Sequence, residues 1–344
     1  MEEMKVWLQG QKEPVFRAKQ IFEWLWKHGV FDVDKMTNLS LSLREALRSS
    51  FIIQPLTKVH QEESTDKETT KFLWQLYDGK MVESVLIRAP GRRTVCVSSQ
   101  VGCPVRCAFC ASGKGGFVRD LSASEIVCQV LAIQQELQAV EDERITNVVY
   151  MGMGEPLRNY DAVVESIRFL SDPAYLGFSK RRITLSTVGI VENILRLAND
   201  GVGVNLAISL HASRQEIRQK IIPYARQYPL EEIMKAVDYF HEATGRDITY
   251  EYILLAGVND RIEDAKDLCA LLRGRQGSVN LIPYNAIPGI TLQRSTTRDI
   301  GAFREYLDRM GIVNTCRYTK GTDIAAACGQ LALRESMGED GGAV

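Results

Sequence analysis

Three cysteines stand close together in the first third of the chain. Cys103, Cys107 and Cys110 follow the spacing Cys-x3-Cys-x2-Cys. Thiolates are soft ligands that select iron–sulfur clusters or zinc. Three thiolates on one short loop can ligate three irons of a [4Fe–4S] cluster, which leaves one iron open to the amino and carboxylate groups of S-adenosylmethionine (SAM). A zinc ion is the alternative, but a structural zinc site requires a fourth ligand, which this loop does not supply.

A glycine-rich turn follows an apolar run downstream. The run Thr146–Met151 leads into Met151-Gly-Met-Gly-Glu155. Glycines allow the backbone to approach a ligand closely, and Glu155 is placed to accept a hydrogen bond from an ammonium group. The motif alone is a weak signal, and a simple tight turn is the alternative interpretation.

The other cysteines divide into two groups. Cys96 precedes the cluster motif by seven residues, and Cys328 lies in a segment of small residues, Ala325-Ala-Ala-Cys-Gly329. Such a segment suits the close approach of a large substrate to a thiol, although a structural role is the alternative for each. The remaining three are predicted to be buried and inert, because they lie within predicted helices or a strand: Cys128, Cys269 and Cys316.

The composition is that of a globular protein. Of 344 residues, 45% are apolar and 25% are charged, and the net charge is −1. This charge excludes a uniformly basic nucleic-acid-binding surface, so any such contact would use local patches. The sequence contains no uninterrupted apolar run of about 18 residues, so it predicts no membrane span. The start Met1-Glu2-Glu3-Met4 lacks a secretory signal pattern, so we expect a cytoplasmic protein.

The elements that must position these residues fall into several segments. Residues 1–55 have apolar residues at helical spacing and predict a small helical module, with a capping box formed by Ser42 and Glu45. Alternation over residues 70–88, with a turn at Asp78-Gly79, predicts a β-hairpin, followed by a linker at Pro90–Arg93. We therefore predict four segments: a helical module (1–55), a hairpin extension and linker (56–94), a core (95–331) and a flexible tail (332–344).

The core alternates short apolar runs with amphipathic stretches. One predicted helix begins at Ser122, which with Glu125 has capping-box spacing, and another spans Leu230–Ala243. Strand–helix alternation predicts an α/β fold with a parallel sheet, closed or partly closed as a barrel. The predicted strands are Val95–Ser98, Thr146–Met151, Arg182–Ser186, Val204–Ser209, Thr249–Leu254, Val279–Pro283 and Val313–Tyr318.

Several motifs resemble those of known enzymes. The three-cysteine loop, with Phe109 before the last cysteine, resembles that of the radical SAM superfamily. More narrowly, four motifs in order resemble the RlmN/Cfr family of RNA adenine methyltransferases. They are Cys96-Val-Ser-Ser-Gln-Val-Gly-Cys103, Met151-Gly-Met-Gly-Glu-Pro-Leu157, Ser209-Leu-His211 and Asp323-Ile-Ala-Ala-Ala-Cys-Gly-Gln-Leu331. The resemblance implies a partial (βα)6-type barrel.

The resemblance also assigns roles to residues. It implies that Cys328 carries a methyl group, that Cys96 later closes a transient disulfide with it, and that Glu83 accepts a proton from adenine. For Glu83, a charged residue that guards an edge strand is the alternative. The implied [4Fe–4S] ligands are Cys103, Cys107 and Cys110. The implied SAM contacts are Gly154, Glu155, Ser186, Ser209, Leu210, His211 and Asn285.

The implied reaction uses two SAM molecules and methylates carbon 2 of adenine 2503 in 23S rRNA and of adenine 37 in tRNA. The continuation Pro156-Leu-Arg-Asn159 favours this type over the carbon-8 resistance type, which remains an alternative. A non-catalytic RNA-binding protein with a structural metal site is another. The implied partners are rRNA, tRNA and an electron donor such as flavodoxin or ferredoxin, and we expect a monomer. RNA contacts are predicted at Arg92–Arg93, at Lys180–Arg182 and on the N-terminal helices.

Overall fold

The computed structural model describes residues 2–53, 56–141, 143–317 and 320–331. The predicted tail, 332–344, lies outside these residues. The chain begins with a helical module, as predicted, in which Leu8, Ile21 and Leu47 are fully buried in a core of the module's own. Its helices are α1 (Glu2–Gly10), α2 (Arg17–Phe22) and α3 (Leu41–Ser50), with a π-helical turn at Glu23–Lys27 and a 3-10 turn at Val33–Lys35.

The start of α3 differs from the prediction. The hydroxyl of Ser40 accepts a 3.2 Å hydrogen bond from the amide of Leu43 and caps the helix. The predicted capping box of Ser42 and Glu45 is therefore wrong, because Ser42 already lies inside the helix. Ser40 and Ser42 are equally suitable N-cap residues by type, so only the backbone conformation decides which of them caps the helix.

The first four strands form an antiparallel half-sheet: β1 (Leu56–Glu63), β2 (Thr69–Leu76), β3 (Met81–Ala89) and β4 (Arg92–Cys96). The predicted hairpin is confirmed, and its turn is closed by a 3.1 Å hydrogen bond from the amide of Lys80 to Asp78. The predicted linker at Pro90–Arg93 is wrong, because Gly91 turns the chain with φ +65° and β4 begins directly after it. The sheet consequently continues from the extension into the core.

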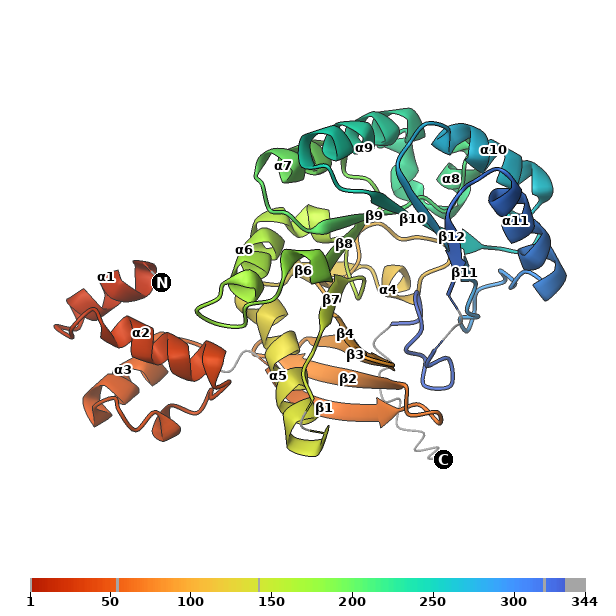
Figure 1. Ribbon diagram of the computed structural model, residues 1–344. Coiled ribbons are helices and arrows are strands. Elements are labelled where there is room, and N and C mark those ends of the chain that lie inside the picture. The colour runs from red at the N-terminus through yellow and green to blue at the C-terminus, as the bar shows by residue number, and fades with distance from the viewer. Residues whose placement is uncertain (1, 54–55, 142, 318–319, 332–344) are drawn as a thin grey trace, which may run out of the picture.

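The second half of the sheet is parallel (Figure 1). Its six strands, together with β4, which pairs in parallel with β7, correspond to the seven predicted core strands. Following β4 are β7 (Asn147–Tyr150), β8 (Ile183–Thr187), β9 (Asn205–Ser209), β10 (Ile248–Leu254), β11 (Gly277–Pro283) and β12 (Asn314–Cys316). Strands β1 and β12 each have one neighbour within the described residues. The sheet is therefore open, as a partial barrel requires.

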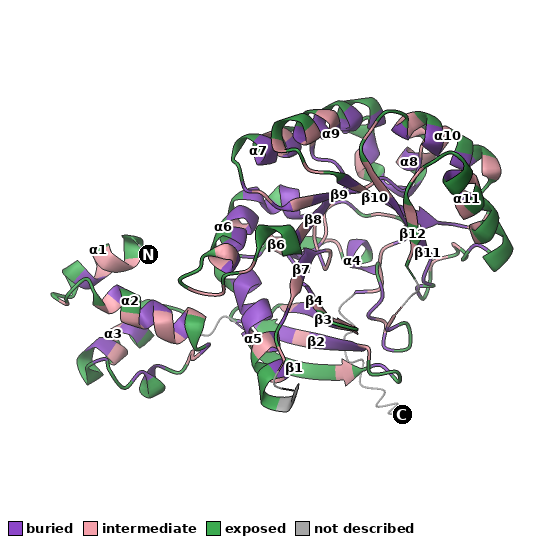
Figure 2. Ribbon diagram, viewed as in Figure 1, coloured by how far each residue is buried: buried purple, intermediate pink, exposed green. Residues whose placement is uncertain are grey.

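Helices connect the parallel strands and cover the outer face of the curved sheet (Figure 1). They are α5 (Ala123–Glu141), α6 (Tyr160–Ser171), α7 (Val191–Asn199), α8 (Gln215–Ile221), α9 (Leu230–Thr244), α10 (Ile262–Leu272) and α11 (Thr297–Arg309). The capping box predicted for α5 is confirmed: Ser122 Oγ accepts from the Glu125 amide, and the Glu125 carboxylate accepts from the Ser122 amide. Figure 2 shows the buried residues gathered between helices and sheet.

A smaller unit lies inside the curve of the sheet. Strands β5 (Gln100–Gly102) and β6 (Phe117–Asp120) form an antiparallel pair, and α4 (Ala111–Lys114) lies between them in sequence. The connection from β5 to α4 carries the three clustered cysteines. This unit places the connection over the carboxyl ends of the parallel strands, where barrel enzymes build their sites.

Among the described residues, no helix combines the length and the apolar character that a membrane span requires.

The helical module packs against the core through aromatic side chains. The rings of Phe22 and Phe169, the latter in α6, stack with centroids 6.4 Å apart. The side-chain amide of Gln135 in α5 donates a hydrogen bond to the carbonyl of Gly29. These contacts fix the module against the outer helices, on the side of the molecule away from β10–β12 (Figure 1).

Candidate active site

The cluster loop, residues 103–110, is fixed at several points along its length. The Cys103 amide donates a 2.8 Å hydrogen bond to the carbonyl of Gly116, and the Ala108 amide donates a 2.9 Å bond to the carbonyl of Ile221 at the end of α8. A Cβ at Gly102 would lie 1.9 Å from the same Gly116 oxygen, so this position requires glycine. The loop is therefore built to a fixed shape.

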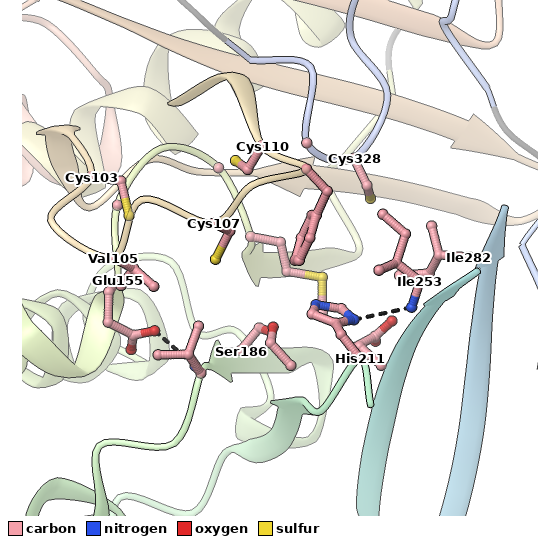
Figure 3. A pocket seen from close by; sticks show the side chains of 18 of the residues that line it. Cys103, Val105, Cys107, Cys110, Glu155, Ser186, His211, Ile253, Ile282 and Cys328 are labelled. Carbon is pink, nitrogen blue, oxygen red and sulfur yellow. Dashed lines mark hydrogen bonds between the residues drawn. The ribbon is translucent and has the colours of Figure 1, made fainter. Parts of the chain in front are cut away.

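The three thiols of the cluster loop line one pocket (Figure 3). Burial raises the pKa of each thiol, that of Cys103 to about 12, so the thiols are protonated in the protein alone. Thiols must lose their protons to bind metal. Among the described residues, no three Cys, His, Asp or Glu side chains converge closely enough for a single metal ion. A [4Fe–4S] cluster fits this arrangement, since each thiolate then ligates a different iron.

The opposite wall of this first pocket is built from the ends of β7, β8 and β9. Glu155, Ser186 and His211, labelled in Figure 3, line it together with Ser209. The hydroxyl oxygens of Ser186 and Ser209 lie 3.3 Å apart. The pocket encloses about 830 Å³ of empty space, part of it open to solvent.

Glu155 is buried and held by the main chain. Its carboxylate accepts hydrogen bonds from the amides of Leu157 (2.9 Å) and Val188 (2.8 Å). Burial raises the pKa of Glu155 to about 7, although these bonds act in the opposite direction. Each carboxylate oxygen has a second lone pair, so the group can still accept from a ligand in the pocket.

The glycines of the motif have a packing role in addition to the ligand approach that was predicted for them. A Cβ at Gly154, whose φ is +104°, would lie 2.7 Å from the Gln100 side chain, and a Cβ at Gly152 would lie 2.7 Å from the carbonyl of Val97. Both positions therefore require glycine because the chain after β4 packs against them. Gly154 also lines the first pocket, as predicted.

His211 is a buried residue with an unusual backbone conformation. Its φ is +58°, a strained value for a non-glycine residue. Its Nδ1 accepts a 3.0 Å hydrogen bond from the amide of Ile253 (Figure 3), so Nε2 carries the proton. Burial lowers the pKa of His211 to about 3, and the charge of Arg218 adds to this effect. His211 is therefore neutral and can donate one hydrogen bond through Nε2.

Two residues predicted to contact SAM do not line the first pocket. Leu210 is fully buried, and its amide donates a 3.0 Å hydrogen bond to the carbonyl of Glu251 in β10. Asn285 lines a second, neighbouring pocket, and its side-chain amide donates a 3.3 Å bond to the carbonyl of Cys328. Leu210 thus positions its neighbours in the motif, and Asn285 holds the segment around Cys328.

Cys328 lies at the boundary of the two pockets and lines both of them. It is an exposed, free thiol. The carbonyl of Gly329 accepts a 2.7 Å hydrogen bond from the Ala111 amide, directly after the cluster loop. Gly329 has φ +81°, and a Cβ there would lie 3.2 Å from the carbonyl of Phe109. The small residue at 329 therefore allows the Cys328 segment to pack directly on the cluster loop.

The second pocket lies between this segment and the antiparallel half of the sheet. Val85, Ile87 and Ala89 on β3 line it together with Thr94 and Cys96 on β4. Cys96 is a buried free thiol, and burial raises its pKa to about 12, with the charge of Cys328 adding to the shift. The two thiols that the sequence singled out therefore face one pocket. Arg92, Arg317 and Lys320 also line it.

Glu83 lies on the same face of β3 as Val85, deeper in the sheet. It is 3% exposed, and its carboxylate lies 3.7 Å from the ammonium of Lys71 on β2. The alternative that Glu83 guards an edge strand is wrong, because β3 lies between β2 and β4. The structure does not place Glu83 among the residues that line either pocket.

Sequence reasoning missed two charged residues of the first pocket, Arg317 and Glu251. Their side chains form an ion pair at 3.7 Å. Arg317 follows β12. Burial acts to lower the pKa of its guanidinium, but the charge of Glu251, followed by the charge and hydrogen bonding of Cys328, raises it. Glu251 could have been identified from the sequence, since it is an acidic residue within the apolar strand β10.

One predicted RNA contact is engaged elsewhere. Arg93 forms a two-nitrogen ion pair with Glu143, and this carboxylate would compete with phosphate. In the helical module, Arg44 donates to the carbonyls of Leu39 and Asp34, both at 3.1 Å, and thus stabilises a loop. The side chain of Arg92 is exposed at the second pocket.

Comparisons with known proteins agree with this architecture. Residues 97–269 match the radical SAM superfamily, and residues 1–53 match the ribosomal RNA large subunit methyltransferase N-terminal domain. The chain is 57% identical to the probable dual-specificity RNA methyltransferase RlmN 2 of Protochlamydia amoebophila, over 97% of this chain and 93% of that protein. It is 44% identical to the corresponding RlmN of Staphylococcus aureus, over 98% and 92%.

A solved structure has the same fold. A radical SAM methyltransferase from Sphaerobacter thermophilus is 42% identical and matches with a TM-score of 0.93 over 96% of both chains. The alternative of a non-catalytic protein with a structural metal site is not supported, since these relatives are methyltransferases. The chain belongs to the RlmN family of radical SAM methyltransferases, enzymes that use a [4Fe–4S] cluster and SAM.

Proposed function

We propose that the enzyme methylates carbon 2 of adenine 2503 in 23S rRNA and of adenine 37 in tRNA, through a methyl group carried on Cys328. The observation that carries this proposal is that Cys328 lines two pockets at once. One pocket holds the candidate cluster ligands, and the other is bounded by the antiparallel half-sheet. A carrier thiol between donor and acceptor pockets can serve both without moving far.

The first pocket takes the cluster and SAM. Cys103, Cys107 and Cys110 are the candidate ligands, and the ligands for SAM are on the opposite wall. Glu155 accepts from the ammonium of SAM, which would form a charge-assisted hydrogen bond. His211 donates a hydrogen bond from Nε2 to SAM, and the hydroxyls of Ser186 and Ser209 line the same pocket. When bound, the cluster and SAM supply methyl groups and the carbon radical chemistry that an unactivated adenine carbon requires.

Cys328 is the methyl acceptor. A thiolate is the competent nucleophile: its sulfur forms a bond to the methyl carbon as the bond from that carbon to the SAM sulfur breaks, and the electron pair of the broken bond leaves with the SAM sulfur. Arg317 lines the same two pockets as Cys328 and places a positive charge there. The exposure of Cys328 agrees with a thiol that must meet two different partners.

The second pocket takes the adenine, which must leave its stack to be modified at a ring edge. Its apolar wall of Val85 and Ile87 can pack against a base, and Arg92 and Lys320 offer positive charge for phosphate. Glu83, on the same strand face, is the proposed acceptor of the proton that carbon 2 loses. These features support RNA as the substrate, as the names of the relatives indicate.

Cys96 completes the reaction. Its thiolate attacks Sγ of Cys328 while that sulfur is joined to the methylene carbon on adenine. A sulfur–sulfur bond forms and the carbon–sulfur bond breaks; the electron pair stays with the carbon, which takes up a proton and becomes the methyl group. The disulfide exists only at this stage, and an electron donor such as flavodoxin or ferredoxin must reduce it before the next turnover.

Mass spectrometry of RNA fragments tests the proposed substrates. In a strain that lacks the gene, fragments of 23S rRNA and tRNA should lose one methyl group at carbon 2 of the two adenines. Complementation with this chain should restore both. Restoration at carbon 8 would instead assign the resistance type, and restoration of rRNA alone would remove tRNA from the proposal.

A further inference from the structure

Arg218 of α8 is a fully buried arginine, with 0% of its surface exposed. Its Nε donates to the carbonyl of Leu210 at 3.0 Å. Its Nη2 donates to the carbonyls of Val188 at 2.5 Å and Ser209 at 3.2 Å. These carbonyls follow or end strands β8 and β9. Arginine is almost never fully buried unless it is paired with an opposite charge, so this burial calls for a physical reason.

The contacts of Arg218 do not supply a full partner for this charge. Nη1 of Arg218 is buried and, within the part of the chain that the structure describes, makes no hydrogen bond. No carboxylate of the described residues lies within the 4.0 Å that defines an ion pair with it. Carbonyl dipoles satisfy three of its N–H groups but carry no net charge. An uncompensated buried cation is costly, which indicates that an anion belongs nearby.

The cluster loop is the neighbour that can supply this anion. The end of α8 is tied to the loop by the hydrogen bond from the Ala108 amide to the Ile221 carbonyl. Two of the carbonyls that Arg218 contacts belong to Val188 and Ser209, and both residues line the first pocket together with Cys107. The guanidinium therefore lies behind residues that form the same pocket as the cluster loop. Burial lowers the pKa of Arg218 to about 10, while the charges of Cys107 and Glu155 act to raise it.

We propose that Arg218 is the built-in counter-charge of the [4Fe–4S] cluster and raises its reduction potential. The inference rests on the proposed ligand role of Cys107. A cluster held by thiolates is an anion that gains one further negative charge on reduction, and net charge is one of the terms that set its potential. A fixed positive charge in a buried site stabilises the reduced form more than the oxidised form. Arg218 is therefore a positioning residue, because its charge affects reduction only indirectly, through the cluster.

The test is the midpoint potential of the full-length, anaerobically reconstituted enzyme, followed by electron paramagnetic resonance during a reductive titration. Arg218→Gln keeps hydrogen-bonding groups but removes the charge. We expect its midpoint to become more negative by at least 59 mV, which is a tenfold change in the one-electron equilibrium. Arg218→Lys keeps the charge and should retain the native potential. Arg226→Gln removes an exposed charge in the adjoining turn and should also leave it unchanged.

Each outcome has a definite meaning. A native potential in an iron-loaded Arg218→Gln enzyme, or an equally lowered potential in Arg218→Lys, would overturn the counter-charge role and leave Arg218 as a brace for the strand ends. Should the Gln variant not fold, Arg218→Met removes the charge with an apolar side chain and tests the same shift. Full iron retention in Cys107→Ala would instead show that the ligand assignment has failed, which is a separate result.

Discussion

The main-chain amide of Ala111 donates a 2.7 Å hydrogen bond to the carbonyl of Gly329. This bond joins the residue after the last cluster cysteine to the residue after Cys328, although the two are distant in sequence. The hydroxyl of Ser112 repeats the connection with a bond to the carbonyl of Leu331. The position of the exposed thiol thus depends on the cluster loop, and the backbone that enforces this dependence can be tested directly.

Gly329→Ala should abolish methylation of Cys328 while the fold is retained. The substitution costs about 1–3 kcal/mol of backbone strain at positive φ, and its Cβ would lie 3.2 Å from the carbonyl of Phe109. The matched control is Gly311→Ala, which has φ +73° and no atom within 4 Å of the new Cβ. Thermal unfolding should shift similarly in both variants. Mass spectrometry of the intact protein should find the methyl group only in the control.

Replacing Cys103, Cys107 or Cys110 by Ala should remove the cluster, because one iron then has no ligand. Iron and sulfide analysis after anaerobic reconstitution measures this loss. Cys269→Ala is the control, since this thiol is buried in α10, away from the pocket residues. Stoichiometric zinc without iron in the unmodified enzyme would contradict the assignment.

Glu155→Gln should weaken SAM binding at least tenfold, because a charge-assisted hydrogen bond to ammonium becomes a neutral one. The cluster content should stay intact, which separates this variant from the cysteine variants. Affinity is measured by isothermal titration calorimetry at pH 8, where a carboxyl group with a pKa of about 7 is largely ionised. An unchanged affinity would limit Glu155 to capping the turn at Leu157.

Because His211 is buried and neutral, the free energy of unfolding of the cluster-free protein should decrease as the pH falls. Its folded pKa of about 3 lies below the ordinary value of 6.5, so below pH 6.5 the unfolded chain binds a proton that the folded protein refuses. Stability is therefore lost as pH falls. Relative to His211→Asn, which tolerates positive φ, the native protein should lose about 1.4 kcal/mol between pH 8 and pH 5.5. Denaturant unfolding at both pH values measures this, and a constant difference would contradict the buried neutral state.

Much of the core fold could be predicted because its signals are local. All seven parallel strands, and the capping box of Ser122 and Glu125, follow from short sequence patterns. Strand β1 was not predicted, because it is an exposed edge strand with few apolar residues. The continuation of the sheet through β4 was not predicted either, because Pro90-Gly91 is equally compatible with a linker and with a tight turn.

The site was predictable only where one motif holds several functional residues. The cluster loop and Glu155 were identified from spacing and resemblance, and both line the first pocket. Arg317 and Arg218 were missed because single arginines give no pattern. Their importance comes from contacts between distant segments, such as the pair of Arg317 with Glu251. The second pocket was missed for the same reason, since it exists only where β3, β4 and the Cys328 segment meet.

The proposed mechanism depends on different roles for two thiols in one pocket. Cys328→Ala has no methyl acceptor, so it should give neither methylated protein nor methylated RNA. Cys96→Ala retains the acceptor but has no thiolate to break the carbon–sulfur bond. Cys316→Ala, which changes a thiol at the end of β12 outside both pockets, serves as the control and should turn over normally.

The most direct measurement is a denaturing gel of Cys96→Ala after incubation with RNA substrate, SAM and reductant. The two-thiol mechanism predicts a slowly migrating band in which the protein is covalently bound to RNA, and nuclease treatment should collapse that band to the free protein. Cys328→Ala should give no such band under the same conditions. Normal turnover by Cys96→Ala without the band, or product formation by Cys328→Ala, would rule out this mechanism.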